Sequence, residues 1–346
     1  MPHSTYRYVR HADTATGTHI DGSDMATPRH QQICLEQTPY YHCVSRCVRR
    51  AFLCGIDKAT GRSFEHRRGQ IELRLHHLAT VFAIDVAAYA IMSNHYHVVL
   101  RVNDNDARGW SDDQVLDRWA QLFKLPDIVQ SARRGASLHS SERAQLAQFI
   151  TTYRTRLHSI SWFMKCLNTD IARAANKEDE CTGRFFEGRF KCQALLDEAA
   201  LLKCMAYVDL NPVRAKIAAS AESASHTSMT YRLSSGPAIL LPFADEVSTA
   251  VASPDKSRPW REIPYLPFNF SDYREVVEWS AHSDVRPPSL LTRSLLLSRN
   301  LNIRSWLDSL RGGELSKPCV LGASKRIREF ATAVGRSWMW GVGANG

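Results

Sequence analysis

The chain has 346 residues, of which 44% are hydrophobic and 23% are charged, a balance that excludes a disordered, collagenous or fibrous protein. Its 44 lysines and arginines exceed its 35 aspartates and glutamates, and the net charge of +9 weakly favours an anionic partner such as nucleic acid. No stretch approaches the roughly 20 apolar residues of a membrane-spanning helix, and the polar N-terminus has no apolar secretion segment, so we expect a cytosolic protein. The nine cysteines form no CxxC pair and are predicted to be free thiols, most of them buried.

The first part of the chain predicts a strand, a helix and then further strand. Residues 1–33 are polar and are expected to form a mobile extension. The alternating run Tyr40–Arg50 predicts a strand that ends in basic residues. Apolar residues at i, i+4, i+7 and i+11 predict an amphipathic helix over Ile71–Phe82. The apolar run Ile84–Val102 predicts two buried strands joined near Ser93–Asn94, or one long bent strand.

The middle of the chain changes to a helical pattern and then returns to a strand. Residues 111–180 are predicted to form a helical insertion. The clearest apolar stripe of this insertion, at helical spacing, is a packing face made of Leu157, Ile160, Met164, Leu167 and Ile171. The basic and aromatic run Gly183–Leu195 predicts a short strand. A helix is then expected over Glu198–Leu210, with Asp197 as its N-cap and Asn211–Pro212 at its end.

The C-terminal part has a weaker pattern. Residues 218–257 are rich in Ala, Ser and Pro and are expected to link to a mainly helical accessory region, 258–346. Up to residue 217 the predicted order is strand, helix, strand, strand, helical insertion, strand, helix. We therefore predict an α+β fold, with a ferredoxin-like antiparallel sheet and helices on one face.

Two histidines in the run SNHYHVVL are the sharpest local feature. Side chains two apart on a strand point to the same face, so His95 and His97 should project together, with Tyr96 on the other side. Two such imidazoles can hold a divalent metal ion through their unprotonated nitrogens. An HxH run also occurs by chance, and each histidine can equally be an ordinary polar residue at a sheet edge. The other histidines, including His42, are interpreted as surface or core residues.

Tyr207 lies near the end of its predicted helix and shares one stripe with Lys203 and Asn211. A second stripe, which contains Leu201 and Met205, has the character of a packing side, so Tyr207 is expected to turn away from the core. A tyrosine hydroxyl is a poor nucleophile at neutral pH, and attack on phosphate would need a metal ion or nearby cations. On its own, a tyrosine on a helix is usually structural.

Cations and aromatic rings are interleaved in Gly183–Leu195. Single-stranded nucleic acid suits this mixture, with cations for phosphates and rings for bases. Plain sheet packing explains it equally well, because Phe186 and Phe190 share one face. The candidate DNA-binding residues on this run and on neighbouring elements are Arg46, Arg49, Arg50, Arg184, Arg189, Lys191, Lys203 and Arg214.

Three motifs, SNHYHVVL, GRFFEGRFKCQALLDEAALL and YVDLNPVRAK, follow one another after an opening strand with YYHCVSR. In this order they resemble the REP-associated tyrosine transposases, which belong to the single-tyrosine transposases named for a histidine–hydrophobic–histidine motif. The similarity covers residues 34–217. It implies a ferredoxin-like transposase domain with the histidine pair on a central strand and the tyrosine on a following helix.

The resemblance also implies a mechanism. His95 and His97 would bind Mg²⁺ or Mn²⁺, and the ion would polarise a phosphate of single-stranded DNA. Tyr207 would attack in line, forming a 5′-phosphotyrosine link and freeing a 3′-hydroxyl, with no nucleotide cofactor. The third metal ligand would be Asn211, one helical turn after the tyrosine, although a residue before Pro212 is pushed out of helical geometry.

The family recognises palindromic DNA elements that fold as hairpins, and the resemblance implies a bacterial, nucleoid-associated protein without membrane attachment. Its members act as monomers or dimers, so self-association stays open. The accessory region 258–346 is a candidate for hairpin contacts or for covering the site. Two other functions remain: a hairpin-binding protein of the same fold that does not cleave and, remotely, a metal-dependent phosphoesterase. The latter would normally need a third histidine or a carboxylate near the pair, whereas Val99 and Arg101 stand there.

Overall fold

The computed structural model describes residues 27–48, 53–57, 60–235, 239–247, 262–283, 285–311, 320–339 and 341–343. Its centre is a four-stranded antiparallel sheet with the strand order β2-β3-β1-β4. The strands are β1 (Tyr40–Arg46), β2 (Ile84–Ile91), β3 (His95–Val102) and β4 (Lys191–Ala194). In the chain, α1 (His66–Val81) joins β1 to β2, and α6 (Ile160–Glu178) precedes β4. This β-α-β-β-α-β order confirms the predicted α+β, ferredoxin-like fold.

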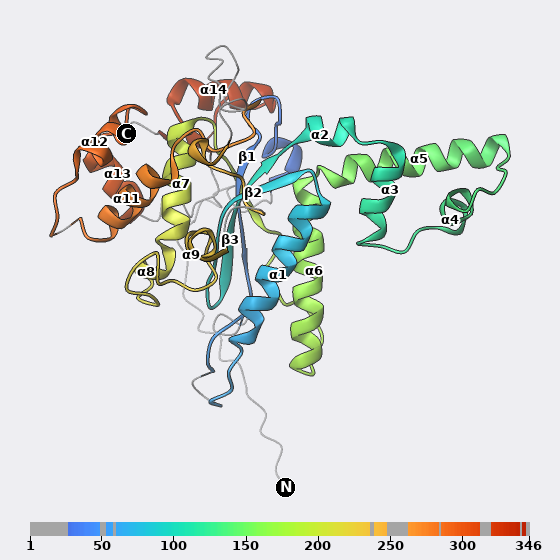
Figure 1. The fold of residues 1–346 in the computed structure, drawn as a ribbon, viewed down its shortest axis with the longest axis horizontal. Helices are drawn as coiled ribbons and strands as arrows, with labels where there is room; N and C mark the ends of the chain where they lie inside the picture. The colour runs from blue at the N-terminus through green and yellow to red at the C-terminus, as the bar shows by residue number, and fades with distance from the viewer. Residues whose placement is uncertain are drawn as a thin grey trace, which may run out of the picture.

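The alternation of side chains gives the sheet two different faces. On one face, Tyr41, Tyr96 and Val98 join residues of α1 and α6 in one hydrophobic core, and the two helices lie side by side (Figure 1). The other face is covered by α7 (Glu198–Asp209), which packs on β2 and β3 in a second core. Helices therefore cover both faces of the sheet, whereas the sequence predicted helices on one face only.

The ends of α7 are set by two local features. The Asp197 carboxylate accepts a hydrogen bond of 2.8 Å from the backbone N–H of Ala200, which confirms the predicted N-cap. At the other end, Leu210 separates α7 from the short helix α8 (Asn211–Arg214). Pro212 lies in the first turn of α8, where its missing N–H costs no hydrogen bond. Asn211–Pro212 thus begins a new helical turn, whereas the sequence predicted only the end of a helix there.

The predicted helical insertion, residues 111–180, contains α3 (Asp112–Ala120), α4 (Asp127–Arg133), α5 (Ser140–Leu157) and α6. The first three, with the preceding α2 (Asp104–Gly109), form an arm that extends away from the sheet, whereas α6 packs against it (Figure 1). The apolar stripe predicted as one helical face is divided between α5, which ends at Leu157, and α6, which begins at Ile160. All five side chains of that stripe are buried, as predicted.

The predicted strand Gly183–Leu195 is a strand only over β4. Before β4, the chain forms a loop that makes an isolated bridge between Phe186 and Cys47, the residue after β1. The Glu187 N–H also donates a 2.9 Å hydrogen bond to the Arg46 carbonyl. Residues 183–190, which the sequence assigned to the strand, therefore form a loop beside the end of β1.

Much of the predicted linker 218–257 is packed on the sheet. The helix α9 (Ser228–Ser235) follows a bridge between Thr227 and Ala90 of β2. The Arg232 guanidinium donates to the carbonyls of Ala87 and Leu241, at 3.1 and 2.9 Å. Residues 248–257 lie outside the described part of the chain.

The C-terminal region contributes helices to the second core. These are α11 (Phe270–Ala281), α12 (Leu290–Leu297) and α13 (Ile303–Arg311), and α13 contacts α7. A small parallel pair of strands, β5 (Val320–Gly322) and β6 (Gly341–Gly343), flanks α14 (Ser324–Ala333). Two 3₁₀ turns, η2 (Arg29–Gln31) and η3 (Ala244–Glu246), complete the helical elements of the described residues.

Two further predictions concern the whole chain. The eight cysteines within the described residues are free, and six of them are buried, as predicted. In the part of the chain that the structure describes, no helix has the length and apolar character needed to cross a membrane. Most of the expected N-terminal extension, up to residue 26, lies outside the described residues.

Candidate active site

The strand β3 carries the histidine pair on the face that α7 covers. His95 and His97 point to this face, and their ring centroids are 4.8 Å apart. Tyr96 points into the opposite core, where its hydroxyl donates to the side-chain oxygen of Asn168. The structure thus brings the two rings together, as alternation along a strand predicts.

His42 of β1 is a further member of the site, which sequence analysis interpreted as an ordinary surface or core residue. Its Nε2 lies 2.9 Å from Nδ1 of His97, and its Nδ1 lies 3.3 Å from Oε1 of Gln193 on β4. All three side chains are buried. Period-two alternation alone places His42 and Arg46 on one face of β1, but the pairing of β1 with β3 and β4 was needed to bring Gln193 and His97 to His42.

Tyr207 and Asn211 approach the histidines from α7 and α8. The Tyr207 ring centroid lies 5.7 Å from that of His97 and 6.3 Å from that of His42, in edge-to-face arrangements. The Asn211 side-chain nitrogen lies 3.1 Å from Nε2 of His97. The structure therefore brings together the four residues that the sequence singled out for chemistry.

The expected orientation of Tyr207 is corrected by the structure. The sequence placed Tyr207 away from the core, yet its side chain is 5% exposed and faces the sheet. The cause is that the C-terminal helices pack against α7 as well, so both of its stripes are buried. Lys203 is 4% exposed for the same reason and lies inside the protein, although it was predicted to contact DNA.

Burial determines the charge of the histidines. Loss of solvent lowers the pKa of His42 and of His95 to about 4, and the Arg46 cation contributes to the shift of His95. Burial also holds the pKa of His97 well below its usual range, with further contributions from the neighbouring histidines and Arg214. All three imidazoles are consequently neutral at pH 7, and each has a nitrogen lone pair.

A cavity of about 630 Å³ opens in front of these side chains. Four of the eight predicted DNA-binding residues line it, namely Arg46, Arg189, Lys191 and Arg214. The Arg214 guanidinium carbon lies 4.7 Å from the centre of the Tyr207 ring. Glu187 adds a carboxylate to the lining, which the sequence analysis did not single out. The cavity is thus basic overall.

A groove of about 500 Å³ adjoins this cavity and shares Gly188 and Arg189 with it. Its lining includes Arg173 and Arg184 and contains no carboxylate. Arg184, another predicted DNA-binding residue, is exposed here. Arg49 and Arg50, also predicted to bind DNA, lie outside the described residues.

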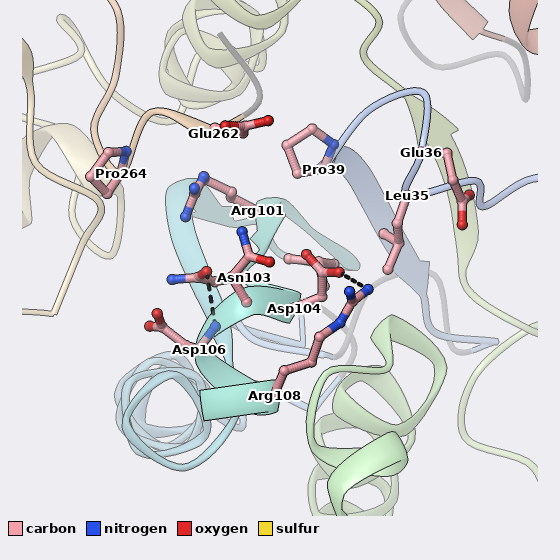
Figure 2. Close-up of a pocket in the computed structure, with 12 residues that line it drawn as sticks. Leu35, Glu36, Pro39, Arg101, Asn103, Asp104, Asp106, Arg108, Glu262 and Pro264 are labelled. Atoms are coloured by element: carbon pink, nitrogen blue, oxygen red, sulfur yellow. Dashed lines mark hydrogen bonds and ion pairs between the residues drawn. The ribbon is translucent and has the colours of Figure 1, made fainter. Parts of the chain in front are cut away.

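A second cavity of similar size, about 600 Å³, lies near the other end of β3 (Figure 2). Arg101, Asp104 and Asp106 line it; Arg101 pairs with Asp85 at 2.8 Å, and Asp104 pairs with Arg108 at 2.5 Å. Glu36 and Glu262 also line it. These carboxylates disfavour a phosphate ligand. The two cavities are similar in size, and the cavity at the histidines differs from this one in the charge of its lining.

The residues around His97 fit a divalent cation. His95 and His97 offer two neutral imidazoles. Asn211 faces His97 with its amide nitrogen, and rotation of the amide would present an oxygen of the type that hard cations bind. Among the described residues, no group of three His, Cys, Asp or Glu side chains could hold a metal ion. Two imidazoles and an amide would leave coordination positions open for a phosphate and water, which is typical of a catalytic rather than a structural metal site.

No protein-family model matches the chain, and no curated protein matches it significantly. Among solved structures, it is similar to a REP-associated tyrosine transposase bound to a REP hairpin, with 10% sequence identity and a TM-score of 0.32. The similarity covers 58% of this chain and 82% of that chain. A similarity at this level assigns neither an activity nor any site residue to this protein.

Proposed function

We propose that this protein cuts and rejoins single-stranded DNA through a covalent link to Tyr207. The observation that supports this most is the position of the Tyr207 ring, which packs edge-on against His97 in a basic cavity. A nucleophile, a pair of neutral imidazoles and several cations are the groups that transfer of a phosphate to tyrosine requires. The three sequence motifs that resemble the REP-associated tyrosine transposases favour the same reaction.

The proposed reaction has two steps that mirror each other. First, the Tyr207 oxygen gives its proton to solvent water and attacks the phosphorus of a backbone phosphate; water later returns one proton to the leaving 3′ oxygen, so protons balance. The bond from phosphorus to the 3′ oxygen of the preceding nucleotide breaks, and that oxygen leaves as a 3′-hydroxyl after taking up a proton. The strand is then held as a 5′-phosphotyrosine. Attack by a 3′-hydroxyl on this link restores a phosphodiester and frees Tyr207, so no nucleotide cofactor is consumed.

Several residues of this chain have separate roles in the proposed reaction. His95, His97 and the Asn211 oxygen would hold Mg²⁺ or Mn²⁺, which when bound supplies positive charge to a phosphate oxygen. The Arg214 cation over the Tyr207 ring attracts the negative charge that develops on the tyrosine oxygen. Arg46, Arg189 and Lys191 present further positive charge to the phosphates of the strand.

The basic groove beside the cavity supports a strand as the substrate. Because the groove shares Gly188 and Arg189 with the cavity, nucleotides next to the reacting phosphate can continue into it, past Arg184 and Arg173. A small phosphate ester would need no such extension. The sequence motifs add hairpin DNA as the form of the strand to test, with the hairpin followed by an unpaired segment.

A covalent-adduct experiment tests this proposal. The protein and its Tyr207→Phe variant are incubated with labelled hairpin DNA that carries an unpaired segment, with Mn²⁺ or with a chelator, and are separated on a denaturing gel. We expect an adduct that needs Mn²⁺ and disappears in Tyr207→Phe, because the phenyl ring keeps the packing against His97 but lacks the attacking oxygen.

The matched control is Tyr231→Phe, since Tyr231 lies on α9 and packs on His76 away from the cavity. This variant should keep the adduct. An adduct that persists in Tyr207→Phe would contradict the assignment of the nucleophile. If neither protein forms an adduct while both bind the hairpin, the chain is a hairpin-binding protein that does not cleave.

A further inference from the structure

We propose that Gln193 and His42 act as positioning residues that fix the tautomer of His97, so that its Nε2 lone pair faces the cavity. This inference rests on the proposed metal site, because it concerns the atom that His97 would offer to the ion. It assigns a role to two buried residues that do not reach the cavity themselves.

Three adjacent strands build this arrangement. Gln193 of β4 stands directly opposite His42 of β1, and His97 of β3 is diagonal to His42, because His42 pairs with Val99. Diagonal neighbours lie within reach of long side chains. The His42 and His97 rings differ in orientation by only 12°, and their centroids are 5.1 Å apart. With a nitrogen–nitrogen distance of 2.9 Å, the rings meet edge to edge in nearly one plane, which aligns an N–H with a lone pair.

The direction of the hydrogen bonds follows from the acceptor at one end. Oε1 of Gln193 can only accept, so Nδ1 of His42 must carry the hydrogen. A neutral imidazole carries one hydrogen, and Nε2 of His42 is therefore an acceptor. Nδ1 of His97 must then donate to it. Nε2 of His97 is left with its lone pair, which is the form that a metal ion binds.

The other side of His97 agrees with this direction independently. The Asn211 side-chain nitrogen, which can only donate, lies 3.1 Å from Nε2 of His97. With an acceptor at Gln193 and a donor at Asn211, the single hydrogen between the two rings lies on Nδ1 of His97. Partners of this kind, one step removed from the metal, typically change metal affinity by about 10- to 100-fold when they are lost.

The tautomer of His97 can be measured directly in the protein without metal or DNA. In protein labelled with ¹⁵N at histidine, long-range hydrogen–nitrogen correlations distinguish the protonated from the unprotonated ring nitrogen of His97. We expect Nδ1 to be protonated and Nε2 unprotonated in the unaltered protein. The inference is overturned if Nε2 of His97 carries the hydrogen, and this measurement does not depend on a variant that folds.

Two substitutions of Gln193 then separate positioning from packing. Gln193→Met has a similar length but no acceptor, and it should mix the two tautomers of His97 and weaken Mn²⁺ binding by about 10- to 100-fold in calorimetric titration. Gln193→Glu restores an acceptor and should restore the Nδ1–H form. If His97 has the same tautomer and the protein the same Mn²⁺ affinity in Gln193→Met as in the unaltered protein, the inference is overturned. If the unaltered protein binds no Mn²⁺, the proposed function fails, while the tautomer measurement still decides the role of Gln193 and His42.

Discussion

The two faces of the central sheet are built from the same strands but have different roles: one closes a hydrophobic core, and the other carries the candidate site. On β1 and β3, the residues that face α1 and α6 include Tyr41, Cys43 and Val98, which close a hydrophobic core. Their immediate neighbours, His42 and His97, face α7 and build the candidate site. A shift of one residue in strand pairing would exchange the two sets of side chains. The site is therefore held by the same register that stabilises the core, and this makes its geometry rigid.

The difference between the faces leads to a testable separation of chemistry from stability. Substitutions of the site residues on the α7 face should change the reaction and leave the fold, whereas substitutions in the core on the other face should do the reverse. The helix α7 belongs to both groups, because its Tyr207 faces the cavity and its other apolar residues pack in the second core.

After Tyr207→Phe, the largest effect on chemistry is expected for His95→Ala. His95 is only partly buried; its side chain hydrogen-bonds to that of its neighbour Asn94, and its ring packs edge-on against His97. We expect adduct formation with Mn²⁺ to fall by more than about 100-fold, because loss of a direct ligand exceeds the cost of losing a second-layer partner. The free energy of unfolding in urea should change by less than about 1 kcal/mol. A stability loss as large as that of a core substitution would contradict the separation of the two faces.

The largest effect on stability is expected for Phe163→Ala on the opposite face. Phe163 of α6 is fully buried and packs edge-on against Phe82, with ring centroids 5.3 Å apart. Truncation of a buried phenylalanine costs about 3–5 kcal/mol through lost burial and a cavity. Urea denaturation measures this loss. The fraction that remains folded should bind Mn²⁺ with unchanged affinity, and a parallel loss of affinity would show that the faces are coupled.

A smaller effect is expected for Asp209, which ties α7 to the C-terminal region. Its buried carboxylate accepts hydrogen bonds from the Ser228 hydroxyl at 2.6 Å, the Met229 N–H at 3.2 Å and the Tyr273 hydroxyl. Asp209→Ala removes the acceptor of the Met229 N–H and the Tyr273 hydroxyl, while the Ser228 hydroxyl keeps the Tyr89 carbonyl at 3.3 Å. We expect a loss of about 1–3 kcal/mol in the free energy of unfolding. Tyr273→Phe removes one donor only and should cost about 1 kcal/mol. Equal costs for the two variants would mean that the other donors find new partners.

The smallest effect is expected from single arginines of the groove. Each phosphate contact in a single strand contributes about 0.7 to the slope of log affinity against log salt concentration. Arg184→Gln and Arg189→Gln should each lower that slope by about this amount for DNA with an unpaired segment. Arg304→Gln is the control, since that side chain is 94% exposed on α13 and lies outside both linings. Unchanged slopes for Arg184→Gln and Arg189→Gln would place the strand elsewhere.

The sequence by itself determined the order of the elements and the direction of many side chains. Period-two alternation predicted that His95 and His97 share a face, and helical spacing predicted the stripe that joins Tyr207 to Asn211. These features depend only on residues close together in the chain. The α+β fold followed from the same local patterns, because the order of strands and helices leaves few ways to form a sheet.

Only the tertiary structure decided which distant residues complete the site. His42 and Gln193 carry no local signal, and they reach His97 through the pairing of β4, β1 and β3. Tyr207 faces the cavity instead of solvent because the C-terminal helices bury the other side of α7. Strand register and helix packing arise from contacts between segments far apart in the chain. The periodicity of any single segment does not contain that information, and this is why the histidine pair was predicted and the residues that position it were not.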